Sequence, residues 1–198
     1  HSPRASFPSF LYSILNILSP VIPIKNEDVY ESINCLERIK KEISSKNISK
    51  DNPSLILAKW ITGIPLIYYP WGLEAAAIRF KNSLQENAKM HVIIEDVVES
   101  CHNGVVAWEK KSQIQPILLK GADDYIKTKE KYQILIKYFQ ENKIEYREIN
   151  SVKGSILSKI ITLIYLLDYA AIYKSVIDEI DPSPVKSIEY IKKRIGTN

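Results

Sequence analysis

Four short apolar stretches, separated by segments of helical length, constrain the fold more than any other feature of this sequence. They cover residues 64–69, 90–98, 114–119 and 144–149. The first is apolar on both faces, which is typical of a strand buried in a parallel sheet. Strands joined by long helical crossovers pair in parallel. The sequence therefore predicts an α/β fold, a doubly wound parallel sheet flanked by helices.

Helical patterns account for most of the remaining chain. The predicted helices cover residues 7–18, 26–45, 54–61, 73–85, 125–141, 155–175 and 181–194. Prolines, glycines and capping residues at their ends support these boundaries. We expect a single domain of 198 residues with helical N-terminal segments (1–62), an α/β core (63–180) and a C-terminal helix (181–198).

Composition and charge narrow the classes of partner. Hydrophobic residues make up 45% of the chain and charged residues 25%, which is ordinary for a globular protein. The formal net charge is +4, and the lysines are scattered along helix faces, so we expect a solvated surface and no nucleic-acid binding. A mild positive field still favours an anionic substrate such as a sugar phosphate.

The cysteines and the apolar runs bear on the cellular setting. Cys35 and Cys101 fit neither a metal motif nor a disulfide framework, which favours a reducing cytoplasm. The longest apolar run, 156–171, is interrupted by polar residues and falls short of the roughly 20 residues that span a bilayer, so we expect no membrane association. The start at His1, without a methionine, indicates a processed chain or a piece of a longer one, and no secretory signal is expected.

A carboxylate and an imidazole stand out as candidates for chemistry. Glu86 lies at the C-terminal end of the helix that follows the first strand, and His102 follows the second strand. These two groups can move protons on a carbon next to a carbonyl and open a sugar ring. Without further information, Glu86 reads as a surface acid paired with Lys89 or Lys81, and His102 as a loop residue. Because ligands bind beyond the carboxyl ends of parallel strands, Glu86 reaches a site only if its helix crosses the sheet edge or faces a partner.

The segment around Glu86 resembles the archaeal-type bifunctional phosphoglucose/phosphomannose isomerases, which are built from sugar isomerase (SIS) domains. That family carries Asn-Glu-Asn-Ala-Lys at this step, and here Gln85 replaces the first Asn while Glu86 to Lys89 match. The resemblance implies that Glu86 is the base that shuttles a proton between C1 and C2 of the sugar.

The segment around His102 also resembles the family, which has Asn-His-Asn-Glu at this place. His102 and Asn103 match, whereas Cys101 and Gly104 replace the flanking residues. The resemblance implies that His102 opens the sugar ring, entering the active site from the neighbouring subunit of a homodimer.

Three further residues carry the resemblance at the two ends of the chain. Arg4 stands in a Pro-Arg-Ala segment, and the family's arginine stabilises the negative charge of a cis-enediolate. The segment 181–185 matches the family's Asp-Pro-Thr-Pro-Val, with Ser183 as the nearest hydroxyl to a family threonine. A family lysine one helix later, which contacts the substrate, corresponds to Lys192, or to Lys193 if the register differs by one.

The resemblance covers nearly the whole chain but only the back part of a complete enzyme. It implies a C-terminal SIS domain of an aldose-ketose isomerase that interconverts glucose 6-phosphate, and mannose 6-phosphate, with fructose 6-phosphate through a cis-enediol, without metal or cofactor. The family's serine-rich phosphate loops belong to a first SIS domain that is absent here. After the first strand this chain has Tyr69-Pro70-Trp71-Gly72, which does not suit a cradle of backbone amides. The alternatives are a non-catalytic phosphosugar-binding module and a structural dimerisation domain.

Overall fold

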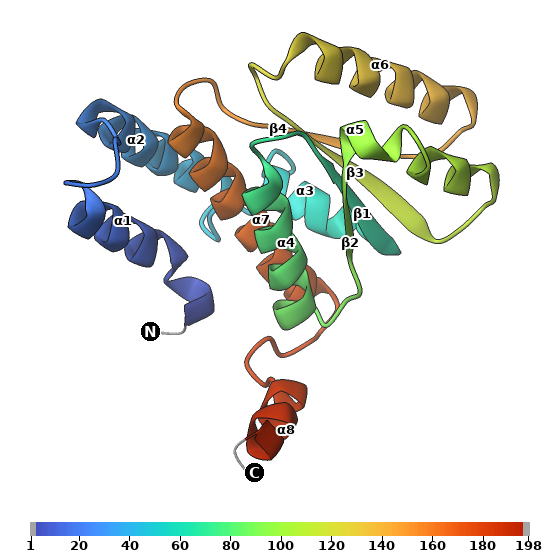
Figure 1. Cartoon of the computed structure of the whole chain (residues 1–198). Helices are drawn as coiled ribbons and strands as arrows, with labels where there is room; N and C mark the ends of the chain where they lie inside the picture. Colours follow the sequence, from blue (N-terminus) through green and yellow to red (C-terminus); the bar gives the residue numbers. More distant parts are fainter. Residues whose placement is uncertain (1–2, 196–198) are drawn as a thin grey trace.

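The computed structural model describes residues 3–195 and contains a single parallel sheet between layers of helices (Figure 1). The elements, in chain order, are η1 (Pro3–Ala5), α1 (Phe7–Leu18), α2 (Asn26–Ile43), α3 (Pro53–Trp60), β1 (Ile64–Tyr69), α4 (Glu74–Asn87), β2 (Ile93–Asp96), α5 (Val97–Ser100), η2 (Gly104–Glu109), β3 (Ile114–Lys120), α6 (Ile126–Glu141), β4 (Arg147–Asn150), α7 (Ile156–Ile177) and α8 (Lys186–Ile195).

The sheet has the strand order β2-β1-β3-β4, and all three pairings are parallel. In register, Leu66 lies beside Ile93 and Ile67 beside Ile117, while Leu119 pairs with Ile149. The chain passes from β1 to β2 on one side and then returns across β1 to β3 and β4 on the other. This reversal is the doubly wound arrangement expected from the sequence, and the α/β prediction is confirmed.

Each face of the sheet has its own core. On one face α2, α3, α4 and α7 share one core with strand residues such as Ile67 and Ile117. On the other face α5, η2 and α6 cover Leu66, Tyr68 and Leu118. In Figure 1, α8 stands away from the sheet, beyond the C-terminal end of α4. The α8 end of the chain thus lies beside the end of α4 that carries Glu86.

The long apolar helix α7 is the centre of the larger core. It has 22 residues and is long and apolar enough to cross a membrane by length and composition alone. Here it packs against α2, α3 and α4, and 56% of its apolar window is buried inside the protein. The same apolar character is what a helix enclosed by three others requires.

The N-terminus of α7 is held by a carboxylate from α2. The backbone N–H of Ser155 and the hydroxyl of Ser158 both donate to Glu31, each over 2.8 Å. The preceding Gly154 has a φ of +123°, a conformation that favours glycine. The bond from the Ser155 amide, reinforced by the Ser155 and Ser158 hydroxyls, lowers the pKa of Glu31 below its ordinary 4.5.

We expect this contact to make stability depend on pH in the acid range. A folded-state pKa below the unfolded value means that the Glu31 contribution is present above pH 4.5 and is lost as the pH falls through the lowered value. The change Glu31→Gln should lower the thermal midpoint at neutral pH, and the difference from wild type should narrow on acidification. Thermal midpoints of both proteins, measured from neutral pH down to the lowest pH at which they still fold, test this pH dependence. A constant difference at every pH would contradict it.

Element ends differ from the sequence predictions where side chains cap the backbone. The prediction of a strand through Val98 is wrong, because the chain turns into α5 after Asp96. The Asp96 carboxylate accepts from the N–H groups of Val98 and Glu99, which caps that short helix. The fourth strand begins at Arg147 rather than at residue 144. Within the segment 181–198, α8 covers Lys186–Ile195; residues 196–198, like His1, lie outside the described part.

Candidate functional site

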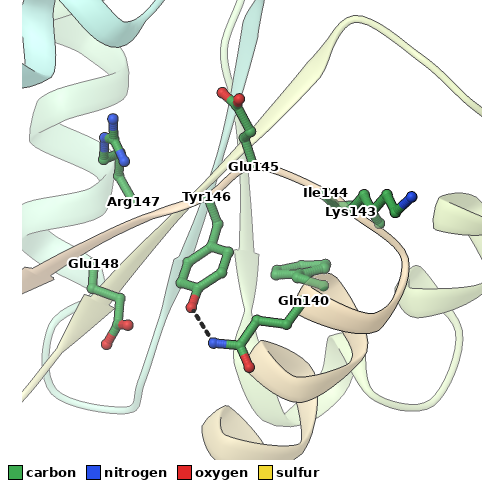
Figure 2. A pocket seen from close by; sticks show the side chains of 8 residues that line it. Gln140, Lys143, Ile144, Glu145, Tyr146, Arg147 and Glu148 are labelled. Atoms are coloured by element: carbon green, nitrogen blue, oxygen red, sulfur yellow. Dashed lines mark hydrogen bonds between the residues drawn. The ribbon is translucent and has the colours of Figure 1, made fainter.

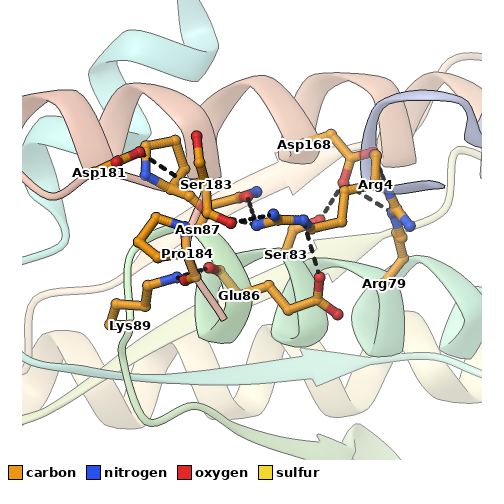
Figure 3. Close-up of polar contacts among 11 residues, drawn as sticks. Arg4, Arg79, Ser83, Glu86, Asn87, Lys89, Asp168, Asp181, Ser183 and Pro184 are labelled. Atoms are coloured by element: carbon orange, nitrogen blue, oxygen red, sulfur yellow. Dashed lines mark hydrogen bonds and ion pairs between the residues drawn. The ribbon is translucent and has the colours of Figure 1, made fainter. Parts of the chain in front are cut away.

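The guanidinium group of Arg4 joins three segments that are far apart in the sequence (Figure 3). Its Nε lies 3.4 Å from Oε2 of Glu86, at the C-terminal end of α4. Its Nη1 donates to the carbonyl of Pro182 over 2.6 Å and to Oδ1 of Asn87 over 3.3 Å. Its Nη2 donates to the carbonyl of Ser183 over 3.0 Å. The structure thus brings together Arg4, Glu86 and Ser183, which the sequence suggested separately.

Glu86 pairs with this arginine and not with the neighbouring lysines. It lies seven positions after Arg79, in the last turn of α4, and its side chain is 37% exposed. Lys89 binds the main-chain carbonyl of Glu86 and leaves the carboxylate to Arg4. The expectation that Glu86 is a surface acid paired with Lys89 or Lys81 is therefore wrong as to the partner.

A groove of about 670 Å³ runs past Glu86 between the end of α4 and the start of α8. It is lined by Gln85, Glu86, Lys89, Ile180, Asp181, Pro184, Val185, Lys186, Ser187 and Ile188. The carboxylate of Glu86 therefore faces both a fixed cation and an open cavity. A small polar molecule in this groove could contact Glu86.

Lys89 adds a second cationic contact to the loop before α8. Its φ of +56° places it in the left-handed region, which is uncommon for a residue with a side chain. Its Nζ donates to the carbonyl of Glu86 over 2.5 Å and to that of Pro184 over 2.8 Å. Arg4 and Lys89 together hold the carbonyls of three successive residues, 182 to 184. This loop is thereby fastened to the end of α4.

Ser183 takes part through its backbone. Its carbonyl accepts from Arg4, and its N–H donates to Oδ1 of Asp181 over 2.9 Å. This hydrogen bond from the backbone N–H of Ser183 keeps the pKa of Asp181 below its ordinary value. The resemblance pointed to the hydroxyl of Ser183, whereas the contact made with Arg4 is main-chain.

A largely buried ionic pair, with side chains 20% and 17% exposed, lies directly behind Arg4, and the sequence assigned it no chemistry. Arg79 of α4 binds Asp168 of α7 in a bidentate manner, with Nε at 3.0 Å from Oδ1 and Nη2 at 2.9 Å from Oδ2. The hydroxyl of Ser83 also donates to Asp168. Burial raises the pKa of Asp168, and the bonds from Arg79 and Ser83 oppose that rise. An aspartate within the most apolar stretch of the chain was the available signal, since a buried charge needs a partner.

His102 is not brought to this site within one chain. It is exposed in the turn after α5, beyond the carboxyl end of β2, and its backbone N–H donates to Glu99. Glu86 lies at the opposite edge of the sheet, because α4 runs back from the carboxyl end of β1. A contact between His102 and Glu86 would require a second copy of the chain, as the resemblance implies, and this stays a prediction.

Lys192 and Lys193 are not brought to the Arg4 group either. Both are exposed on α8, and neither forms a hydrogen bond or ion pair with any residue from 3 to 195. The register between these two lysines therefore stays open.

The turn after β1 has the form expected from its sequence. The N–H of Leu73 donates to the carbonyl of Pro70 over 3.0 Å, and those of Ala76 and Ala77 donate to Leu73. Trp71, between them, is 90% exposed. With Pro70 lacking an N–H and these amides bonded internally, the turn leaves little of the donor set that holds a phosphate in other α/β folds.

A second hollow, of about 690 Å³, lies on the far side of the molecule between the end of α6 and β4 (Figure 2). Gln140 donates to the hydroxyl of Tyr146 across it over 3.0 Å. Its charged residues, Lys143, Glu145, Arg147 and Glu148, are of mixed sign, so it has no clear preference for an anion. Among residues 3–195, no three His, Cys, Asp or Glu side chains gather as a metal site.

Comparison with known proteins supplies the family. Residues 50–195 match the model of the bacterial phosphoglucose isomerase C-terminal SIS domain. The chain is 28% identical over 192 residues to a bifunctional phosphoglucose/phosphomannose isomerase of Caldicellulosiruptor bescii, covering 94% of this chain and 56% of the relative. It is 27% identical over 190 residues to a protein of the same name from Thermoplasma acidophilum, covering 93% of this chain and 57% of that relative.

Solved structures agree on the fold. A glucose-6-phosphate isomerase-like protein from Thermus thermophilus superposes with a TM-score of 0.66 at 16% identity, over 80% of this chain and 55% of that one. A glucosamine-6-phosphate deaminase from Thermotoga maritima superposes with a TM-score of 0.58 at 13% identity, over 89% of this chain and 53% of that one. The chain thus spans little more than half the length of the relatives that it matches. Since the family model covers most of its residues, this chain belongs to the bacterial phosphoglucose isomerase C-terminal SIS domain family.

Proposed function

We propose that this chain is the C-terminal half of an aldose-ketose isomerase that interconverts glucose 6-phosphate and mannose 6-phosphate with fructose 6-phosphate. The observation that carries the proposal is the Arg4–Glu86 pair, with Nε and Oε2 separated by 3.4 Å at the edge of an open groove. The names of its relatives supply the substrate class.

The chemistry proposed for the pair is proton transfer through a cis-enediol. The Glu86 carboxylate takes the proton from C2 of the open-chain aldose and returns it to C1, while the hydroxyl proton of O2 moves to O1, so that O2 becomes the carbonyl oxygen and O1 the alcohol. The oxyanion that develops in the enediolate lies against the guanidinium of Arg4, which stays charged at any physiological pH. A carboxylate that is 37% exposed, and already next to a cation, meets the geometric need for both steps.

Other groups belong to the proposal through the family resemblance. His102 of a second subunit would assist ring opening in a homodimer, and Lys192 or Lys193 would contact the ring oxygen or the phosphate. Ser183 would contribute to substrate binding beside Arg4. The setting would be cytoplasmic, with no metal, nucleic acid or membrane involved.

A second candidate is a non-catalytic module that binds a phosphosugar. Both terminal nitrogens of Arg4 are occupied by main-chain carbonyls of residues 182 and 183, which leaves Nε as its contact with Glu86. The turn after β1 also has few free amides for a phosphate. The engagement of Arg4 favours binding without turnover, whereas the few free amides of this turn weaken phosphate binding in both candidates.

A coupled assay in deuterium oxide separates the two candidates. The chain is assayed alone and together with any region encoded upstream of it, using glucose 6-phosphate, mannose 6-phosphate and fructose 6-phosphate. Isomerisation with deuterium incorporated at C1 of fructose 6-phosphate or C2 of the aldose supports the enediol route. Transfer without incorporation would point to a hydride shift and overturn the mechanism. Saturable phosphosugar binding without turnover in both preparations would establish the module instead.

A further inference from the structure

The layer behind the proposed site connects the protein interior to Arg4 through one side chain. Nη2 of Arg79 donates to Oδ2 of Asp168 over 2.9 Å and to the main-chain carbonyl of Arg4 over 2.6 Å. The Arg79 guanidinium also lies over the ring of Phe7, with 5.1 Å between Cζ and the ring centroid. Arg79 therefore contacts η1 at the carbonyl of Arg4 and the first residue of α1, Phe7.

We propose that Arg79, oriented by Asp168, is a positioning residue that fixes the backbone at Arg4 and so aims the Arg4 guanidinium at Glu86. The proposal rests on the proposed function for its catalytic consequence. It assigns Arg79 no contact with substrate.

The planar fork of the guanidinium explains why an arginine suits this position. Nε and Nη2 face the two oxygens of Asp168, with Nε 3.0 Å from Oδ1. The second hydrogen of Nη2 points away from that carboxylate and reaches the carbonyl of Arg4. A lysine ammonium carries no such rigid fork, so it cannot hold both partners in fixed directions.

The position of the pair on α4 links it to the proposed base. Arg79, Ser83 and Glu86 are spaced so that they lie on one face of the helix. Asp168 binds Arg79 and Ser83. Arg79 binds the carbonyl of Arg4, and Glu86 binds its guanidinium. Arg4 is thereby fixed at its backbone and at its guanidinium by the same helix. Its long side chain would otherwise sample many rotamers.

A purely structural role for the buried pair makes a different prediction. Replacing a buried ionic pair with apolar residues of similar size commonly preserves stability. The double variant Arg79→Met with Asp168→Leu should therefore stay folded while losing the bond to the Arg4 carbonyl. If the pair only stabilises the core, this variant should behave like wild type.

The test compares that double variant with wild type and with a matched control. The control is Lys120→Met with Glu148→Leu, which removes a 2.6 Å ion pair between β3 and β4. The first readout is backbone hydrogen exchange. Peptides covering residues 3–18 should exchange at least about tenfold faster in the Arg79/Asp168 variant, with α7 unchanged. The control should leave exchange at residues 3–18 as in wild type.

The second readout is the kinetics of sugar-phosphate isomerisation. If the Arg4 guanidinium is no longer held toward the transition state, kcat should fall by about 100-fold with KM nearly unchanged, because a small displacement of a catalytic group slows the chemical step. The single variant Arg79→Lys keeps the positive charge, but its kcat should also stay well below that of wild type. Unchanged exchange at residues 3–18 in the double variant, or an unchanged kcat in an active enzyme, overturns the proposal.

Failure of the proposed function would be visible separately. If Glu86→Gln has no effect on turnover, or no turnover exists, the isomerase assignment fails whatever Arg79 does. The exchange result then still decides whether Arg79 fixes the backbone at Arg4.

Discussion

Replacement of Glu86 by glutamine is expected to lower kcat for sugar-phosphate isomerisation by about 10²–10⁴-fold, the usual contribution of a general base. The amide keeps the size of the side chain but cannot accept the C2 proton. Glu86 is 37% exposed, and its pair with Arg4 lies at the surface, so the loss of stability should stay below about 1 kcal/mol. Steady-state kinetics in both directions, with unfolding in urea, provides the measurement.

Glu74→Gln is the matched control, because it makes the same change in the first turn of the same helix. It should leave kcat within about twofold of wild type, since surface substitutions away from a site are usually small in effect. Retention of most of the wild-type kcat by Glu86→Gln would remove Glu86 from the role of base. Loss of structure in that variant would show instead that the Arg4–Glu86 contact holds the fold.

The single change Arg79→Met is expected to lower the free energy of unfolding by about 2–3 kcal/mol at neutral pH, because it leaves the largely buried Asp168 carboxylate without its cation. Burial already raises the pKa of Asp168, and the guanidinium opposes that rise. Removal of the Arg79 guanidinium should raise the pKa of Asp168 in the folded state further above its value in the unfolded state. The loss of stability is then complete above the raised pKa and becomes smaller as the pH falls below it.

Urea unfolding at about pH 7 and about pH 5 measures this dependence. The partner change Asp168→Leu, added to Arg79→Met, should recover most of the lost stability, since no unpaired charge remains. A loss for Arg79→Met that is the same at both pH values would mean that Asp168 does not respond by protonation.

Local signals in the sequence are enough to predict the sheet. β1 was predicted at residues 64–69 and is found at Ile64–Tyr69, because Gly63 before it and Pro70 after it limit the strand from both sides. The second strand was predicted too long, because Val97 and Val98 fit a strand as well as a helix. The carboxylate of Asp96 decides between these by accepting from the backbone of α5.

The candidate site was much less accessible to pattern reasoning. Glu86 was singled out first by its chemistry and then, like Arg4, by the family resemblance, and no spacing rule relates residues so far apart. The partner of Asp168 could not be identified, since Arg79 lies 89 positions earlier and several cations were available. Such pairings depend on how α4 packs on α7, and helix packing is a tertiary property.

The way in which Arg4 and Lys89 hold the loop before α8 bears on how that loop can change over evolutionary time. Both cations bind carbonyl oxygens of residues 182 to 184, and a carbonyl is offered by every amino acid. These contacts therefore do not depend on which side chains the loop carries. They require only the backbone path set by Pro182 and Pro184. A serine can stand at position 183 where the family has threonine. Substitutions at that position leave the contact between Arg4 and the loop before α8 intact.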